Sequence, residues 1–308
     1  MSKNKFCLYC GLTGIVLCSA VFTMISANDS QKSAADDKHP AQQTTLPPAK
    51  ISNIPSGNRA GERITLTVNN MEYAFHWCPA GTFTMGSPES ETDRWGGETQ
   101  HRVTLTKGFW MQETEVTQEQ WENVKGSNPS HFKGNRLPVE NVSWDDCQYY
   151  LRKLNALISS DYEFSLPTEA QWEYACRAGS TTAYSFGDSR EQLKDYAWFG
   201  AYLTEYGLTA SSGKTTNPVG QKKANAWGLY DMHGNVWEWC NDLWWHDDYP
   251  SGSATDPIGA NNGSFRVGRG GSWNYYALGC RSAFRTRIAP ARREYDWGLR
   301  LSLVDKSK

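Results

Sequence analysis

The chain has 308 residues and a formal net charge of −2. This near-neutral balance gives no support for a nucleic-acid partner or for attraction to an anionic membrane. The 14 Trp and 27 Gly instead indicate a loop-rich domain in which large rings fill the space between irregular segments.

Residues 1–27 have the pattern of a signal peptide. Two lysines precede an apolar stretch over 6–25, and the small residues at 26–27 offer a cleavage site. We therefore expect an exported protein that is periplasmic, at the cell surface or secreted. One alternative is an uncleaved N-terminal anchor, which would be the only contact of this protein with a membrane. The other alternative is lipid attachment at Cys18.

Residues 28–61 are polar and contain proline, with hardly any large apolar side chains. This composition predicts a disordered linker. The folded domain is then expected over 62–304, a length sufficient to bury a core.

Five of the eight cysteines lie beyond the predicted signal peptide, namely Cys78, Cys147, Cys176, Cys240 and Cys280. In an oxidising compartment this odd number predicts one or two disulfides and at least one free thiol, and the spacing does not fix the pairing. No CxxC occurs among the five, so a structural zinc site is not expected.

The folded part begins with a predicted β-hairpin. Residues 63–68 and 71–77 show strand-like alternation on either side of Asn69 and Asn70. Further strands are predicted at 81–85, 101–105 and 109–112.

Three helix starts share one capping pattern, in which a Ser or Thr hydroxyl caps free amides and an acid or amide three residues later caps back. The three pairs are Thr117 with Gln120, Ser143 with Asp146, and Thr168 with Gln171. The helix after Ser143 carries an apolar stripe that should pack on the sheet. Its members are Trp144, Cys147, Leu151, Leu154 and Ile158. The third helix is expected to end at Gly179, and 180–225 to form a long loop region.

Several motifs in this order resemble the formylglycine-generating enzyme, or sulfatase-modifying factor, family. The resemblance covers about residues 75–303 and includes GTFTMGS (81–87), LPVENVSWDD (137–146), SLPTEAQWEYACRAG (165–179), WGLYDMHGNVWEWCND (227–242), RVGRGGSW (266–273) and GLRL (298–301). It implies an α+β fold of the variant C-type-lectin-like type, with small antiparallel sheets, few helices and extensive loops.

The resemblance implies an oxidation of a client cysteine by copper that two thiolates hold just after Gly270-Gly271-Ser272. Here Tyr275 stands at the first thiolate position, and the segment is shortened where the second should fall. Cys280 remains as a lone thiol, either a nucleophile or, as we favour, a disulfide partner of a residue such as Cys176 or a buried small hydrophobe. Copper and the oxidase activity are therefore not expected.

The same resemblance implies one Ca²⁺ site in the segment 227–242. Its ligands would be the side chains of Asp231 and Glu238 and the backbone carbonyls of Gly234 and Val236. The alternative is a turn in which the two carboxylates only accept hydrogen bonds from backbone amides.

Charged residues outside these motifs have ordinary interpretations. Eight Arg lie between Arg266 and Arg300. Four of them, Arg269, Arg281, Arg285 and Arg300, are expected to donate to loop carbonyls. A patch that binds polyanions is an alternative interpretation of the other arginines Arg287, Arg292 and Arg293. The isolated carboxylates Glu115, Asp145 and Glu169 are expected to be solvated or to cap helices.

The segment 266–300 keeps a Gly, Arg and Ser frame around aromatic and aliphatic positions. We expect a ligand-binding face made of Tyr275, Tyr276, Leu278, Phe284, Thr286, Ile288, Arg292, Tyr295 and Trp297. The alternation resembles variable proteins of diversity-generating retroelements.

The first hypothesis is therefore an exported protein that binds an extracellular or periplasmic protein or glycan. The alternative is a protein-maturation enzyme, a formylglycine-generating or related oxidase, which acts on a secreted client such as a sulfatase. If the aromatic side chains are buried instead, the segment is only structural.

Overall fold

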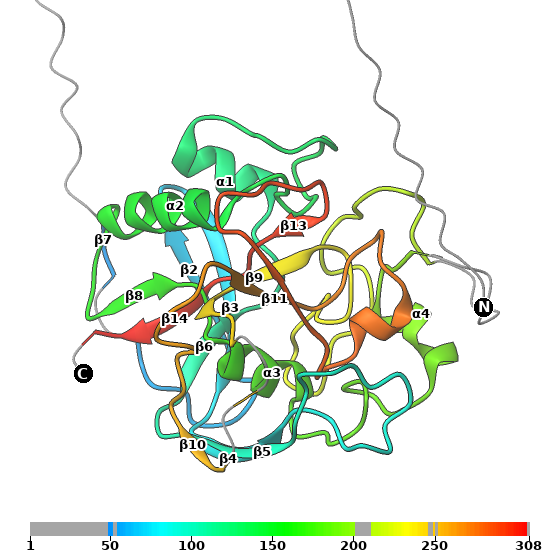
Figure 1. Ribbon diagram of the computed structural model, residues 1–308. Coiled ribbons are helices and arrows are strands. Elements are labelled where there is room, and N and C mark those ends of the chain that lie inside the picture. Colours follow the sequence, from blue (N-terminus) through cyan, green and yellow to red (C-terminus); the bar gives the residue numbers. More distant parts are fainter. Residues whose placement is uncertain (1–48, 52–53, 201–210, 246–248, 250–251, 307–308) are drawn as a thin grey trace, which may run out of the picture. The chain divides into compact units, whose positions relative to one another are not determined.

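The computed structural model describes residues 49–51, 54–200, 211–245, 249 and 252–306, which form an α+β fold (Figure 1). The predicted signal peptide at 1–27, with Cys18, and the linker up to residue 48 lie outside the described residues. Within the described part, no helix has the length and apolar character needed to cross a membrane.

The largest sheet joins the two ends of the domain. Its strands are, in spatial order, β2 (Arg63–Val68), β3 (Met71–Cys78), β6 (Phe109–Gln112), β14 (Ser302–Asp305) and β8 (Tyr162–Ser165). All neighbours are antiparallel. Asn69 and Asn70 adopt φ values of 50° and 62°, which fits the predicted hairpin turn. Strand β14, the last strand of the chain, lies between β6 and β8. The C-terminal end of the domain is therefore part of the same sheet as the N-terminal hairpin.

Three helices begin where the capping pattern predicts. They are α1 (Gln118–Lys125), α2 (Trp144–Ala156) and α3 (Glu169–Arg177), and each has a complete capping box. Helix α2 buries Cys147, Leu151 and Leu154 against the five-stranded sheet, as expected. Ile158 belongs to β7 (Ile158–Ser159) and not to the helix. Helix α3 ends one residue before the predicted Gly179, at Ala178 with φ 47°.

A second sheet contains the strands of the C-terminal segment. Its order is β12 (Arg285–Ile288), β11 (Arg266–Arg269), β9 (Trp237–Leu243) and β13 (Trp297–Gly298). A third sheet contains β10 (Ala254–Thr255), β5 (His101–Leu105) and β4 (Gly81–Met85). Helix α3 contacts β4, β9 and β11 and so lies between these two sheets (Figure 1). The described part of 180–225 contains only η1 (Arg190–Gln192) and α4 (Leu193–Tyr196) besides loops.

Residues 49–51 and 54–61 have defined structure, although their composition predicts a disordered linker. Strand β1 (Ala49–Lys50) pairs in parallel with β7, Ile54 is buried in the core, and Trp110 Nε1 donates to the Pro55 carbonyl at 3.2 Å. The expectation of a disordered linker up to residue 61 is therefore wrong for 49–51 and 54–61. One buried isoleucine was too weak a signal in an otherwise polar stretch.

The expectation of disulfides is wrong among the described cysteines, because all five are free and buried. They are distributed over three separate core clusters. Cys176, the partner considered for Cys280, instead has its Sγ 3.7 Å from Ser282 Oγ. Burial raises the pKa of Cys176 to about 12, so this thiol stays protonated at neutral pH.

Candidate binding face

Four buried arginines support the C-terminal segment, and each forms an ion pair. The pairs are Arg269 with Glu173, Arg281 with Glu98 at 2.7 Å, Arg285 with Glu169 at 2.6 Å, and Arg300 with Glu238 at 2.7 Å. The predicted contacts with loop carbonyls are also present, for example from Arg300 to Tyr230 O at 2.8 Å. The carboxylate partners were not predicted, since each lies on a distant part of the chain.

Two of the isolated carboxylates are not solvated. Glu115 and Glu169 are buried, which corrects the sequence interpretation. Glu169 pairs with Arg285, whereas the Glu115 side chain interacts with the buried carboxyl group of Asp231. Burial and the nearby charge of Asp231 raise the pKa of Glu115 well above its ordinary value. Asp145 is exposed in the first turn of α2, as expected.

Two of the predicted ligand contacts lie in the core. Phe284 is 4% exposed and Trp297 is 6% exposed. The Trp297 ring packs on Trp239 with centroids 4.4 Å apart, and the Phe284 ring on Trp237 at 5.9 Å. The expectation that these two side chains form a surface is wrong, because a cover of neighbouring rings hides them from any ligand.

The other predicted contact residues are at least partly exposed. Arg292 is exposed beside Glu294, and Tyr295 is 54% exposed. Five are half-buried, namely Tyr275, Tyr276, Leu278, Thr286 and Ile288. Tyr275 stacks on Tyr276 at 4.4 Å between centroids. These seven side chains are the part of the predicted face that a ligand can reach.

Tyr295 belongs to a group of rings that we call the aromatic cluster, made of His131, Phe132, Trp273 and Tyr295. His131 stacks on Tyr295 at 4.5 Å and meets Phe132 edge-on at 4.8 Å, and Phe132 meets Trp273 edge-on at 5.3 Å. Trp273 Nε1 donates to the Tyr295 carbonyl at 3.2 Å. His131 and Phe132 were missed because no sequence spacing connects them with the C-terminal segment.

The thiol chemistry of this segment is restricted by burial. Cys280 is fully buried, and burial raises the pKa of its thiol. A Cβ at Gly271 would lie 2.7 Å from Cys280 Sγ. Gly271, whose φ is 80°, therefore packs directly against the sulfur atom. The structure therefore places Cys280 as a buried small hydrophobe and not as an exposed nucleophile.

The side chains expected to bind calcium have other partners. Glu238 accepts from Arg300 through both oxygens and from Trp172 Nε1 at 2.7 Å. Asp231 accepts from the Gly220 amide at 2.7 Å through Oδ2, and its carboxyl group also interacts with the Glu115 side chain. Among the residues described, no three His, Cys, Asp or Glu side chains come together as a metal site. The residues as placed, including the turn through Gly234 and Val236, do not fit the implied four-ligand set.

Calcium chelation tests this geometry. We expect EDTA to leave the melting temperature unchanged in a thermal unfolding scan. The reason is that the Glu238 carboxylate is paired with Arg300 and is not available to bind calcium. A fall of several degrees that added Ca²⁺ reverses would contradict the geometry and support the calcium site that the motif predicts. In that event the shift should disappear in Asp231→Asn, which keeps an acceptor for the Gly220 amide.

The small sheets, few helices and buried Arg–Glu frame define a variant C-type-lectin-like domain of the formylglycine-generating-enzyme type. The chain belongs to the family of the sulfatase-modifying factor enzyme 1-like domain, whose model matches residues 61–304. This confirms the resemblance seen in the motifs.

Two solved structures share the fold over most of their length. One is Treponema denticola variable protein 1, at 33% identity and TM-score 0.69, over 78% of this chain and 98% of that one. The other is PvdO from Pseudomonas aeruginosa, at 27% identity and TM-score 0.67, over 80% and 99%.

Two curated relatives are similar to this chain over about half of its length. The chaperone protein LppX of Paenibacillus barcinonensis is 31% identical over 56% of this chain and 71% of that protein. The formylglycine-generating enzyme of Streptomyces coelicolor is 35% identical over 53% and 55%. The chain thus spans about half the length of this curated enzyme.

Proposed function

We propose that this protein is an exported binding protein on a sulfatase-modifying-factor scaffold. It recognises an extracellular or periplasmic protein or glycan through the exposed residues of its C-terminal segment. The observation that carries this proposal is the aromatic cluster, in which Tyr295 projects from a supported group of rings. Large rings of limited flexibility give contact area at low entropy cost, as in known binding surfaces.

Two further observations support binding rather than oxidation. Tyr275 occupies the position where the family resemblance implies a thiolate, and Cys280 is buried. In addition, a solved relative at 33% identity bears the name of a variable protein. A scaffold whose sequence varies while its frame is kept suits ligand recognition better than one fixed chemistry.

The second candidate is a protein-maturation enzyme, which the name of the Streptomyces relative favours. It would oxidise a cysteine of a secreted client such as a sulfatase. To test this candidate, a cysteine-containing peptide of a sulfatase is incubated with the purified protein and copper and is analysed by mass spectrometry. Conversion of the cysteine to an aldehyde would favour the enzyme.

Removal of the Tyr295 ring is expected to weaken ligand binding at least tenfold, because central aromatic contacts carry most of the binding energy of an interface. The measurement is binding of the purified chain to a glycan array and to surface proteins of its own source, before and after Tyr295→Ala. A Trp273→Ala variant should behave in the same way.

Tyr149→Ala is the matched control, since Tyr149 is an exposed tyrosine on α2, outside the C-terminal segment. Its binding should stay within about twofold of the wild type, a change of less than about 0.5 kcal/mol. Equal binding by the wild type and by both cluster variants would contradict the proposal that the aromatic cluster binds the ligand.

A further inference from the structure

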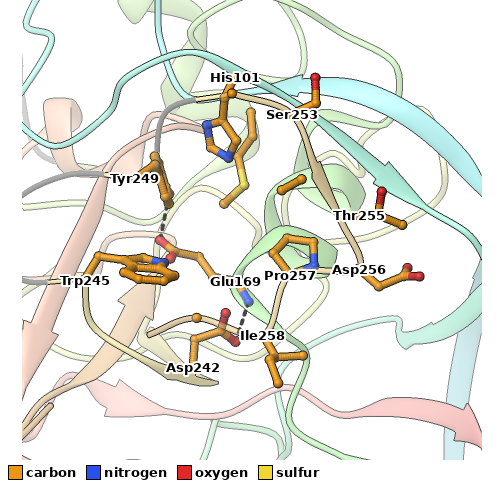
Figure 2. A pocket seen from close by; sticks show the side chains of 14 residues that line it. His101, Glu169, Asp242, Trp245, Tyr249, Ser253, Thr255, Asp256, Pro257 and Ile258 are labelled. Atoms are coloured by element: carbon orange, nitrogen blue, oxygen red, sulfur yellow. Dashed lines mark hydrogen bonds between the residues drawn. The ribbon is translucent and has the colours of Figure 1, made fainter. Parts of the chain in front are cut away.

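A cavity of about 370 Å³ lies apart from the aromatic cluster, between β5, the start of α3, the end of β9 and the segment 252–259. Its wall includes Met85, His101, Glu169, Asp242, Trp245 and Tyr249. Figure 2 shows Trp245 and Tyr249 along one side, with Thr255, Asp256 and Pro257 on the other. This volume suits a small organic ligand.

Asp242 is a buried carboxyl group on the wall of this cavity and is 3% exposed. Its Oδ2 accepts from the Glu169 backbone amide at 2.9 Å, at the first residue of α3. Among the described residues no side chain donates to its other oxygen, and none forms an ion pair with it. A buried carboxylate without a cation is costly, so this group calls for a cationic partner or a proton.

The two arginines whose charges act on Asp242, Arg285 and Arg266, form hydrogen bonds with other groups. Arg285 binds Glu169 through two nitrogens, at 2.8 Å and 2.6 Å. Arg266 donates to the Asn241 carbonyl at 2.6 Å. No described arginine therefore neutralises Asp242 by direct contact.

The protonation of Asp242 follows from this environment. Burial and the charge of Glu169 raise the pKa of Asp242 to about 8, against the opposing effects of the Glu169 amide, Arg285 and Arg266. His101, Tyr249 and Asp256 are the other titratable groups on the cavity wall. At neutral pH Asp242 is thus mostly an uncharged acid.

The aromatic walls of the cavity suit a cation. The rings of His101 and Tyr249 lie 4.6 Å apart between centroids. The Arg285 guanidinium lies over the Tyr249 ring at 4.0 Å, an example of the cation–π contact that such rings make. Met85 adds an apolar contact for a carbon chain.

We propose that this cavity binds the primary ammonium group of a small aliphatic amine, with Asp242 as its counter-ion and Trp245 and Tyr249 along its carbon chain. Binding makes no covalent bond. The Asp242 carboxylic acid gives its proton to the solvent, and its carboxylate pairs with the ammonium group of the ligand. The amine comes either from a free small molecule or from a lysine side chain of a polypeptide.

Titration calorimetry of the purified protein at pH 7 with n-butylamine tests the proposal, with n-butanol as the neutral analogue. We expect the amine to bind at least tenfold more tightly than the alcohol. Repetition in phosphate and in MOPS, neither of which is a primary amine, should reveal release of close to one proton per ligand, because Asp242 ionises on binding. Nα-acetyl-lysine methylamide distinguishes the sources: tighter binding than n-butylamine indicates a polypeptide lysine, and weaker binding indicates a free amine.

The Asp242→Asn variant should lose at least tenfold in affinity for n-butylamine, although its amide oxygen still accepts from the Glu169 amide. Asp145→Asn is the matched control, because Asp145 is an exposed aspartate on α2 and does not line the cavity. Its affinity should change by less than about threefold. The proposal is overturned if butylamine gives no binding heat, binds no better than butanol, or binds Asp242→Asn as well as the wild type. Proton release is measured on the wild type and so decides the question even if the variant does not fold.

Discussion

Replacement of Arg300 by methionine is expected to lower the free energy of unfolding by about 3–5 kcal/mol, because it leaves a buried carboxylate without its cation. Arg300 and Glu238 are both buried, and the guanidinium bonds to both oxygens of the carboxylate. Arg300 also donates to Tyr230 O at 2.8 Å. Its loss therefore also removes a donor from two backbone carbonyls, those of Tyr230 and Gln112. Urea unfolding followed by circular dichroism measures the change.

The double variant Arg300→Met with Glu238→Gln should recover part of the loss, since no unpaired charge then remains in the core. Arg293→Met is the control, because Arg293 forms an exposed pair with Asp146. Exposed pairs contribute at most about 1 kcal/mol. If Arg300→Met were as mild as Arg293→Met, the buried pairs would not be what stabilises the loops around the C-terminal segment.

Local features of this fold could be predicted from the sequence, whereas distant pairings could not. Each capping box lies within four residues, so Thr117, Ser143 and Thr168 marked their helix starts correctly. The hairpin around Asn69 and Asn70 is equally local. In contrast, Arg285 meets a carboxylate 116 positions away. Spacing holds no information about such a contact, so the arginines were identified as scaffold without their partners.

The aromatic positions show a second limit. Phe284 and Tyr295 look alike in the sequence, as large rings within the same Gly and Arg frame. One is buried and the other is exposed, because a neighbouring strand and its rings cover only the first. Alternation of apolar and polar residues shows which side chains of a strand are buried only when one face of the sheet is exposed to water. Here β9 and β11 are largely buried on both faces.

Trp297→Ala is expected to destabilise the fold by about 3–5 kcal/mol, the cost of removing a large ring from a packed core. Trp297 packs against Trp237 and Trp239. Tyr295→Ala, two residues earlier, should change stability by less than about 1 kcal/mol, since a largely exposed ring loses little packing. Denaturant unfolding of the two variants thus separates the structural aromatics of the segment from those available to a ligand. Similar losses for both would contradict this division.

A double-mutant cycle sharpens the test. A Cβ at Gly268 would lie 2.3 Å from Trp297 Cη2, so Gly268→Ala alone should destabilise the protein by overpacking, typically at a cost of about 1–3 kcal/mol. Once Trp297→Ala has removed the ring, the added methyl group meets space and not a rigid wall. The two changes together should therefore cost at least about 1 kcal/mol less than the sum of their separate effects. Simple additivity would mean that the Trp297 ring does not lie on Gly268, and the assignment of Trp297 to the core would fail with it.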